Sequence, residues 1–328
     1  MDKKELEKYI GQPSVTKDGV QVEIVANIGK PEDIDKVLQY DAEGIGLFRT
    51  EFLFMDRTAM PTEEEQFEAY KKVAAAMNGK PVIIRTLDIG GDKEIPYMGL
   101  EKDENPFLGY RAIRLCLDRK EDIYKPQLRA LLRASAFGNI RIMIPLVTCI
   151  DEFREAKALI EEIKKELDEK GIAYKKDIQV GIMVETAAAS LIADIFAKEA
   201  DFFSIGTNDL TQYTMSVDRG NKKISYLYST FNPAVLRSIR HIIACGRETG
   251  IMVGMCGEAA SDPMMVPLLL AFGLNEFSMS ASAVLRTRKL VTGFSIKELQ
   301  AVAEKAMSFA TAAEVEAYMK EFMEKMTD

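Results

Sequence analysis

Eight short apolar runs, each followed by a segment of helical periodicity, constrain the fold of this chain more than any other feature. Parallel strands need helical crossovers, and right-handed crossovers let eight such units close into a barrel. The sequence therefore predicts an α/β fold, a (β/α)8 barrel over residues 20–328, preceded by a linker or helical segment at residues 1–19. The runs lie at residues 20–28, 44–48, 81–84, 140–147, 179–184, 202–205, 251–254 and 276–279.

Composition narrows the class of protein. The chain has 328 residues, of which 47% are hydrophobic, and a net charge of −8 that argues against a general nucleic-acid binder, so an anionic ligand must be held by local arginines. Its four cysteines are widely spaced and form no zinc-type pair, which favours a reduced compartment. We find no secretory signal and no apolar stretch of about 20 residues, and we expect a cytoplasmic protein without membrane insertion.

Polar residues stand where the apolar runs end. In a (β/α)8 barrel the strand ends converge on one face, so these side chains are expected to form a site. Each has an ordinary structural interpretation: an arginine pairs with an acid, an Asn-Asp pair caps a helix, and a free thiol packs in the core. Six at equivalent positions favour a shared site: Arg49, Arg85, Glu185, Asn208, Asp209 and Cys256.

The chemistry of these six residues is coherent. Arginines present planar sets of donors that match phosphate and carboxylate oxygens. Glu185 and Asp209, with Asn208 adjacent, are oxygen ligands of the kind that Mg2+ prefers. Cys256 lies in the segment Gly254-Met255-Cys256-Gly257-Glu258, where glycines permit close approach, and its thiol can deliver a proton to carbon. The set indicates a small phosphorylated carboxylic acid that passes through an enolate.

Five segments carry a specific resemblance. Residues 46–57, 85–93, 104–111, 206–213 and 254–258 resemble, in the same order, the C-terminal half of Enzyme I of the bacterial phosphoenolpyruvate:sugar phosphotransferase system. The similarity runs from about residue 20 to residue 294. Several long motifs in order are more specific than a single short one.

The resemblance implies a homodimeric (β/α)8 domain that binds phosphoenolpyruvate and the cofactor Mg2+. Carried onto matching positions, it implies that Cys256 protonates the enolate carbon to release pyruvate. Glu185 and Asp209 are implied to hold the metal. The implied substrate-binding residues are Arg49, Arg85, Arg111, Asn208, Asp209 and Arg219.

The phosphoryl acceptor departs from the family pattern. Enzyme I carries its phosphorylated histidine in an N-terminal half, which also binds the histidine-containing phosphocarrier protein. The single histidine here, His241, falls within a predicted helix at residues 236–244, without the Ser-His context of the acceptor, and we interpret it as structural or solvated. The chain thus resembles the C-terminal half, whose phosphoryl transfer to histidine begins bacterial sugar uptake and needs the N-terminal domain as partner.

Two alternatives remain open. Pyruvate phosphate dikinase and phosphoenolpyruvate synthase share a related barrel with Arg-Thr-Glu and Cys-Gly-Glu segments, although the uninterrupted blocks at residues 49–57 and 105–111 favour Enzyme I. Alternatively, the chain is a binding module that senses phosphoenolpyruvate without turnover. Calorimetry combined with a pyruvate assay separates binding from turnover.

Overall fold

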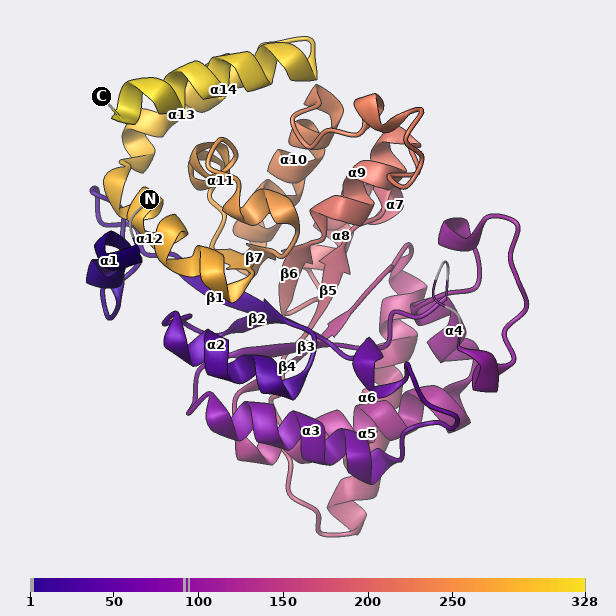
Figure 1. Cartoon of the computed structure of the whole chain (residues 1–328). Coiled ribbons are helices and arrows are strands. Elements are labelled where there is room, and N and C mark those ends of the chain that lie inside the picture. The colour runs from indigo at the N-terminus through magenta and orange to yellow at the C-terminus, as the bar shows by residue number, and fades with distance from the viewer. Residues whose placement is uncertain (1–2, 91–92, 94, 328) are drawn as a thin grey trace. The chain divides into compact units, whose positions relative to one another are not determined.

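The computed structural model describes residues 3–90, 93 and 95–327. Its strands follow one another in chain order around a closed barrel, which confirms the predicted (β/α)8 fold (Figure 1). Each of the eight predicted runs overlaps one strand. The strands are β1 (Glu23–Ile28), β2 (Ile45–Arg49), β3 (Val82–Arg85), β4 (Ile140–Ile144), β5 (Val180–Val184), β6 (Phe202–Ile205), β7 (Met252–Met255) and β8 (Glu276–Met279).

Helices connect the strands and flank both ends of the barrel sequence in the described part of the chain. They are α1 (Lys3–Leu6), α2 (Ile34–Gln39), α3 (Glu63–Ala76), α4 (Ile113–Asp118), α5 (Lys125–Ala134), α6 (Ile150–Glu169), α7 (Ala187–Leu191), α8 (Ala193–Ala197), α9 (Thr207–Met215), α10 (Pro233–Thr249), α11 (Val266–Phe272), α12 (Val284–Gly293), α13 (Ile296–Ala306) and α14 (Ala312–Thr327). None of these described helices is both long and apolar enough to cross a membrane.

The chain divides into two compact units, which we describe separately. Unit 1 comprises Met1–Ala26, Lys36–Gly46 and Val184–Asp328, and unit 2 comprises Asn27–Asp35 and Leu47–Met183. The predicted boundary between residues 19 and 20 stays a prediction.

In unit 2, strands β3, β4 and β5 pair in parallel. Arg85, the last residue of β3, lies opposite Met143 of β4, and Ile142 pairs with Val180 of β5. Helix α3 packs against α5 (Figure 1). All four residues of β3 are buried, as the continuous apolar run predicts for a strand covered on both faces.

In unit 1, strand β7 pairs in parallel with both β6 and β8. Ile205 at the end of β6 lies opposite Met255 at the end of β7. The segments that follow these two strands, which begin at Gly206 and Cys256, therefore leave the sheet at the same edge. Helix α10 contacts both β6 and β7 and covers them on the outside.

The alanine-rich stretch after β5 does not form the single helix that its composition indicates up to about Glu199. Instead, α7 and α8 are separate helices that meet at Ile192, whose φ and ψ are −110° and 27°. Both pack against α10, and Ser190 of α7 forms a hydrogen bond with Ser238 of α10 at 2.5 Å. Packing of two short faces on α10 thus overrides the helical propensity of the alanines.

The long segment between β3 and α4 contains two short 3-10 turns, Pro96–Met98 and Pro106–Leu108. It overlaps two of the motif segments, residues 85–93 and 104–111. Gly91 and Asp92 of the first of these segments lie outside the described residues.

Candidate functional site

Arg85 of unit 2 is held by two carboxylates at the end of β3. Its Nη2 donates to Glu51 Oε1 at 2.9 Å, and its Nη1 lies 3.5 Å from Asp88 Oδ2. The arginine side chain is only 9% exposed. A guanidinium at such depth requires paired anions, because burial of an unpaired charge is costly.

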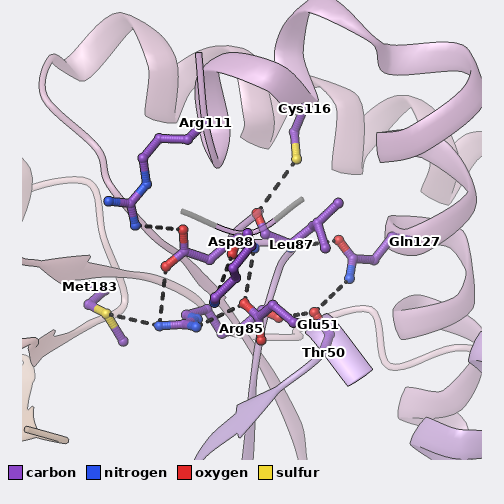
Figure 2. Close-up of polar contacts among 10 residues, drawn as sticks. Thr50, Glu51, Arg85, Leu87, Asp88, Arg111, Cys116, Gln127 and Met183 are labelled. Carbon is purple, nitrogen blue, oxygen red and sulfur yellow. Dashed lines mark hydrogen bonds and ion pairs between the residues drawn. The ribbon is translucent and has the colours of Figure 1, made fainter. Parts of the chain in front are cut away.

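Asp88 joins Arg85 to Arg111 (Figure 2). Its Oδ1 accepts a hydrogen bond from Arg111 Nη2 at 2.8 Å, and its backbone N–H donates to Glu51 Oε1 at 3.2 Å. The structure thus brings together two of the predicted substrate-binding arginines. We call Glu51, Arg85, Asp88 and Arg111 the arginine–carboxylate cluster.

A buried network fixes the backbone beneath this cluster (Figure 2). Gln127 of α5 accepts from the Leu87 N–H at 2.9 Å and donates to Thr50 Oγ1 at 3.1 Å. Thr50 Oγ1 in turn donates to the backbone oxygen of Arg85 at 2.9 Å. These bonds set the direction in which residues 85–88 leave β3, and therefore the direction of both charged side chains.

Tight backbone packing places Arg111. Gly90 has a φ of +110°, and a Cβ there would lie 2.5 Å from the Cβ of Arg111, so only glycine fits. The next residue, Ala112, has φ 49° and ψ −125°, an unusual conformation for a residue with a side chain, and its N–H donates to the Ile89 oxygen at 2.9 Å. Strain of this kind is frequent beside functional groups.

The charge balance of the cluster keeps Asp88 ionised. Burial raises the pKa of Asp88, but the positive charges of Arg85, Arg111 and Lys93 lower it by a larger amount. The resulting pKa is about 2. A carboxyl whose pKa is depressed on folding stabilises the native state above its unfolded pKa, and this contribution is lost as the pH falls through the folded pKa. The relevant window runs from about pH 4 down to about pH 2.

We predict that Asp88→Asn lowers the free energy of unfolding at pH 7 by about 2 kcal/mol. The difference from the wild type should shrink as the pH falls below 4, because the carboxyl of the unfolded wild-type chain is protonated there, and that of the native state near pH 2. Urea denaturation from pH 7 to pH 3 measures it, and Asp122→Asn, which removes an exposed partner of Arg119, serves as the control. A difference that stays constant with pH would contradict the assigned charge.

Arg49 has a different environment from the other two arginines of unit 2. It is the last residue of β2 and is exposed, whereas Arg85 and Arg111 are buried. Its Nη2 lies 4.0 Å from the position that a Cβ on Gly29 would occupy. An exposed guanidinium beside a glycine keeps its donors available to a ligand.

In unit 1, the two predicted metal ligands lie close together. Glu185 directly follows β5 and is 2% exposed, and Asp209 lies in the first turn of α9. One carboxylate oxygen of each lies within 4.8 Å of the other. The donor set fits Mg2+, which binds through one or two carboxylates and completes its shell with water and substrate oxygens.

Cys256 is buried at the end of β7, next to the end of β6. Its backbone N–H donates to the Ile205 oxygen at 3.1 Å, and its thiol lies 3.8 Å from the same oxygen. The following residue approaches α9 so closely that a Cβ on Gly257 would lie 1.7 Å from Thr207 Oγ1. Glycine is therefore required at position 257, and the turn that carries Cys256 is held against Thr207, the residue that precedes Asn208.

The loop after α9 carries Arg219 and returns to the helix through a tyrosine. Tyr228 Oη donates to the backbone oxygen of Asn208 at 3.0 Å. Burial raises the pKa of Tyr228, while Arg219, by its charge and by a hydrogen bond to the phenol oxygen, acts in the opposite direction. Tyr228, Asn208 and Glu258 also line a cavity of about 240 Å3.

His241 lies in α10, as predicted, on its exposed side. Its ring Nε2 is 3.6 Å from Cys245 Sγ, one helical turn further on. Its surroundings contain no feature of a phosphoryl acceptor among the contacts of the described residues.

Sequence reasoning missed the partners of the arginines, namely Glu51, Asp88 and Tyr228. A signal for the first two was present, since Glu51 and Asp88 stand within three residues of Arg49 and Arg85 in the motif blocks. A buried arginine needs an acid, and the nearest acids in the chain were candidates. Tyr228 had no such signal, because it acts through a contact across 20 residues.

The comparisons with known protein families and with curated relatives agree with each other. Residues 3–296 match the family described as PEP-utilising enzyme, PEP-binding domain. The chain is 56% identical over 321 residues to the phosphoenolpyruvate-protein phosphotransferase of Staphylococcus carnosus, covering 98% of this chain and 56% of that protein. It is 54% identical over 318 residues to the protein of the same name from Geobacillus stearothermophilus, covering 97% and 55%. The chain thus spans a little over half the length of these relatives.

A similar solved structure is a citrate lyase from Burkholderia xenovorans LB400. It has a TM-score of 0.52 and 15% sequence identity, and the match covers 94% of this chain and 92% of the lyase. At this identity the likeness concerns the fold alone.

Proposed function

The chain belongs to the family of PEP-binding domains of PEP-utilising enzymes, and we propose that it binds phosphoenolpyruvate with Mg2+ and supplies the phosphoryl group to a histidine on a separate N-terminal domain. The observation that carries this proposal is the arginine–carboxylate cluster, in which one buried aspartate aligns two arginines. Paired guanidinium forks at a strand end are suited to a phosphate dianion.

The substrate-binding residues are assigned as in the sequence prediction. Arg85 and Arg111 bind the phosphate, and the exposed Arg49 adds a third guanidinium. From unit 1, Asn208, Asp209 and Arg219 complete the set. In the cluster itself two carboxylates offset the two buried guanidinium charges, so the further positive charge that favours the ligand must come from Arg49, Arg219 and a bound metal ion.

Glu185 and Asp209 are the residues that would hold Mg2+. Their spacing within 4.8 Å and their exposure, one buried and one partly open, suit two protein ligands that leave room for substrate oxygens. When bound, the metal would spread the negative charge of the enolate and phosphate oxygens.

Cys256 is proposed as the acid that protonates C3 as pyruvate forms. Its thiol donates a hydrogen bond to the Ile205 carbonyl oxygen at 3.8 Å, and a thiol that carries its proton is the form needed in this direction. The contact of Gly257 with Thr207 holds the thiol beside the first turn of α9. In the reverse direction the thiolate removes a proton from pyruvate.

The proposed partners are supported by the relatives, which are named phosphoenolpyruvate-protein phosphotransferases and are nearly twice as long. We assign the acceptor histidine and contact with the histidine-containing phosphocarrier protein to a separate N-terminal domain, in the first step of bacterial sugar uptake in the cytoplasm. We also propose a homodimer. It is supported by an exposed apolar surface on α7 and α8 that includes Leu191, 77% exposed, and Ile195, 41% exposed.

The test of transfer supplies the N-terminal domain of a close relative in trans. With saturating Mg2+, phosphoenolpyruvate should be converted to pyruvate and the added domain should be phosphorylated. Binding without pyruvate formation would favour the alternative of a sensing module. If the chain neither binds phosphoenolpyruvate nor forms pyruvate, the proposal as a whole is contradicted.

We predict that Arg85→Ala weakens phosphoenolpyruvate binding by at least about 2 kcal/mol, because charge-assisted bonds to a buried anion are lost. Isothermal titration calorimetry with Mg2+ measures it. Arg133→Ala is the matched control, since Arg133 also pairs with two carboxylates in unit 2 but lies on α5. Undiminished affinity in Arg85→Ala would leave Arg85 with a structural role only.

A further inference from the structure

Tyr228 contacts two of the proposed substrate-binding residues without having been assigned a role itself. Its hydroxyl donates to the backbone oxygen of Asn208 at 3.0 Å. The phenol oxygen of Tyr228 also interacts with Arg219, whose charge and side-chain hydrogen bond both act to lower the pKa of the tyrosine. A phenol has one proton to donate and lone pairs with which to accept, so a single atom serves both contacts.

Arg219 needs such a support because of where it lies. It is exposed and follows the C-terminus of α9, where Ser216 adopts a left-handed conformation with φ 56°. Its backbone N–H donates to Gln212 Oε1 at 3.2 Å, which fixes the main chain but not the long side chain. A free arginine side chain loses considerable rotamer entropy when it binds a ligand.

Tyr228 lies where it can hold neighbouring residues of the site in place. The tyrosine is partly buried, and its surroundings include the carboxylates of Glu258 and Asp209, which both act to raise the pKa of its phenol. It lines the 240 Å3 cavity together with Asn208 and Glu258, two residues that flank the metal-ligand and thiol positions in sequence.

We propose that Tyr228 is a positioning residue that holds the Arg219 guanidinium against the first turn of α9, ready for the anionic substrate. An arginine that is already ordered loses less entropy on binding, so the tyrosine raises affinity without touching the ligand. This inference rests on the proposed function, because it takes phosphoenolpyruvate as the ligand of Arg219.

The test is a double-mutant cycle with Tyr228→Phe and Arg219→Ala, read by calorimetry with phosphoenolpyruvate and Mg2+. Tyr228→Phe keeps the ring and removes only the hydroxyl, and we expect the Kd to rise about three- to tenfold. If the tyrosine acts through Arg219, the double variant should bind no more weakly than Arg219→Ala alone, within about twofold. Tyr226→Phe is the matched control, since Tyr226 is 79% exposed two residues away.

The outcomes separate this inference from the proposed function. An unchanged Kd in Tyr228→Phe, with Arg219→Ala weakened, overturns the positioning role but leaves the function in place. If the fold-changes in Kd of the two single variants multiply in the double variant, the positioning role is also overturned, because Tyr228 then acts independently of Arg219. Absence of binding by the wild-type chain instead contradicts the proposed function.

Discussion

Cys256→Ser should lower the rate of proton exchange at C3 of pyruvate by a factor of about 10² to 10⁴, the usual contribution of a general acid or base. A serine hydroxyl can still donate to the Ile205 carbonyl that the thiol contacts, so the turn should keep its conformation. Its much higher pKa, however, makes it a poor acid and a poor base. Affinity for phosphoenolpyruvate should stay within a few-fold of the wild type.

Deuterium incorporation into the pyruvate methyl group, followed by NMR with Mg2+ and the N-terminal domain present, measures this exchange. Cys245→Ser is the matched control, because Cys245 is also a buried cysteine of unit 1 but contacts His241 on α10. The control should exchange at the wild-type rate. Exchange that is unchanged in Cys256→Ser would exclude this thiol as the acid.

Arg288→Met should destabilise the chain by about 3 to 5 kcal/mol, because it removes a buried charge together with its ion pair to the partly buried Asp41 and several hydrogen bonds. Arg288 of α12 is fully buried, and its Nη1 donates to Asp41 Oδ2 at 2.8 Å and to the Tyr9 oxygen at 2.9 Å. Its Nε donates to Ser14 Oγ at 3.1 Å. One side chain thus ties α12 to two points of the N-terminal segment and to the turn after α2.

Urea denaturation measures this loss, and the neighbouring substitution Lys289→Met provides the control. Lys289 pairs with Glu5 at the surface, where both side chains are substantially exposed, so its removal should cost far less stability than the removal of Arg288. If Arg288→Met is as mild as this control, residues 1–19 behave as a separable linker, as the sequence analysis expected. A large loss would make the segment part of the folded domain.

The strands and the barrel could be predicted from sequence because burial on both faces leaves a continuous apolar run. The run at residues 81–84 and the strand Val82–Arg85 differ by one residue at each end. Tertiary packing determined the helix boundaries that the local sequence pattern did not predict. The stretch after Glu185 has the composition of one helix, yet it forms two, because both have to pack against α10.

The charged residues of the site could be predicted only in part. Arg85 was predicted because a charge that ends an apolar run is conspicuous, and Arg111 because its motif is specific to the family. Asp88, which pairs with both arginines, was missed, although it stands three residues after Arg85 in the same motif block. Its role depends on the turn fixed by Gln127, a residue 39 positions further along that bonds to Leu87.

The most direct test of the proposed site is a crystal structure with phosphoenolpyruvate and Mg2+ bound. We expect the phosphate on the guanidinium groups of Arg49, Arg85 and Arg111. The metal should be coordinated by Glu185 and Asp209, and C3 of the ligand should face Cys256 Sγ. A ligand bound elsewhere, or bound with C3 turned away from the thiol, would contradict the account.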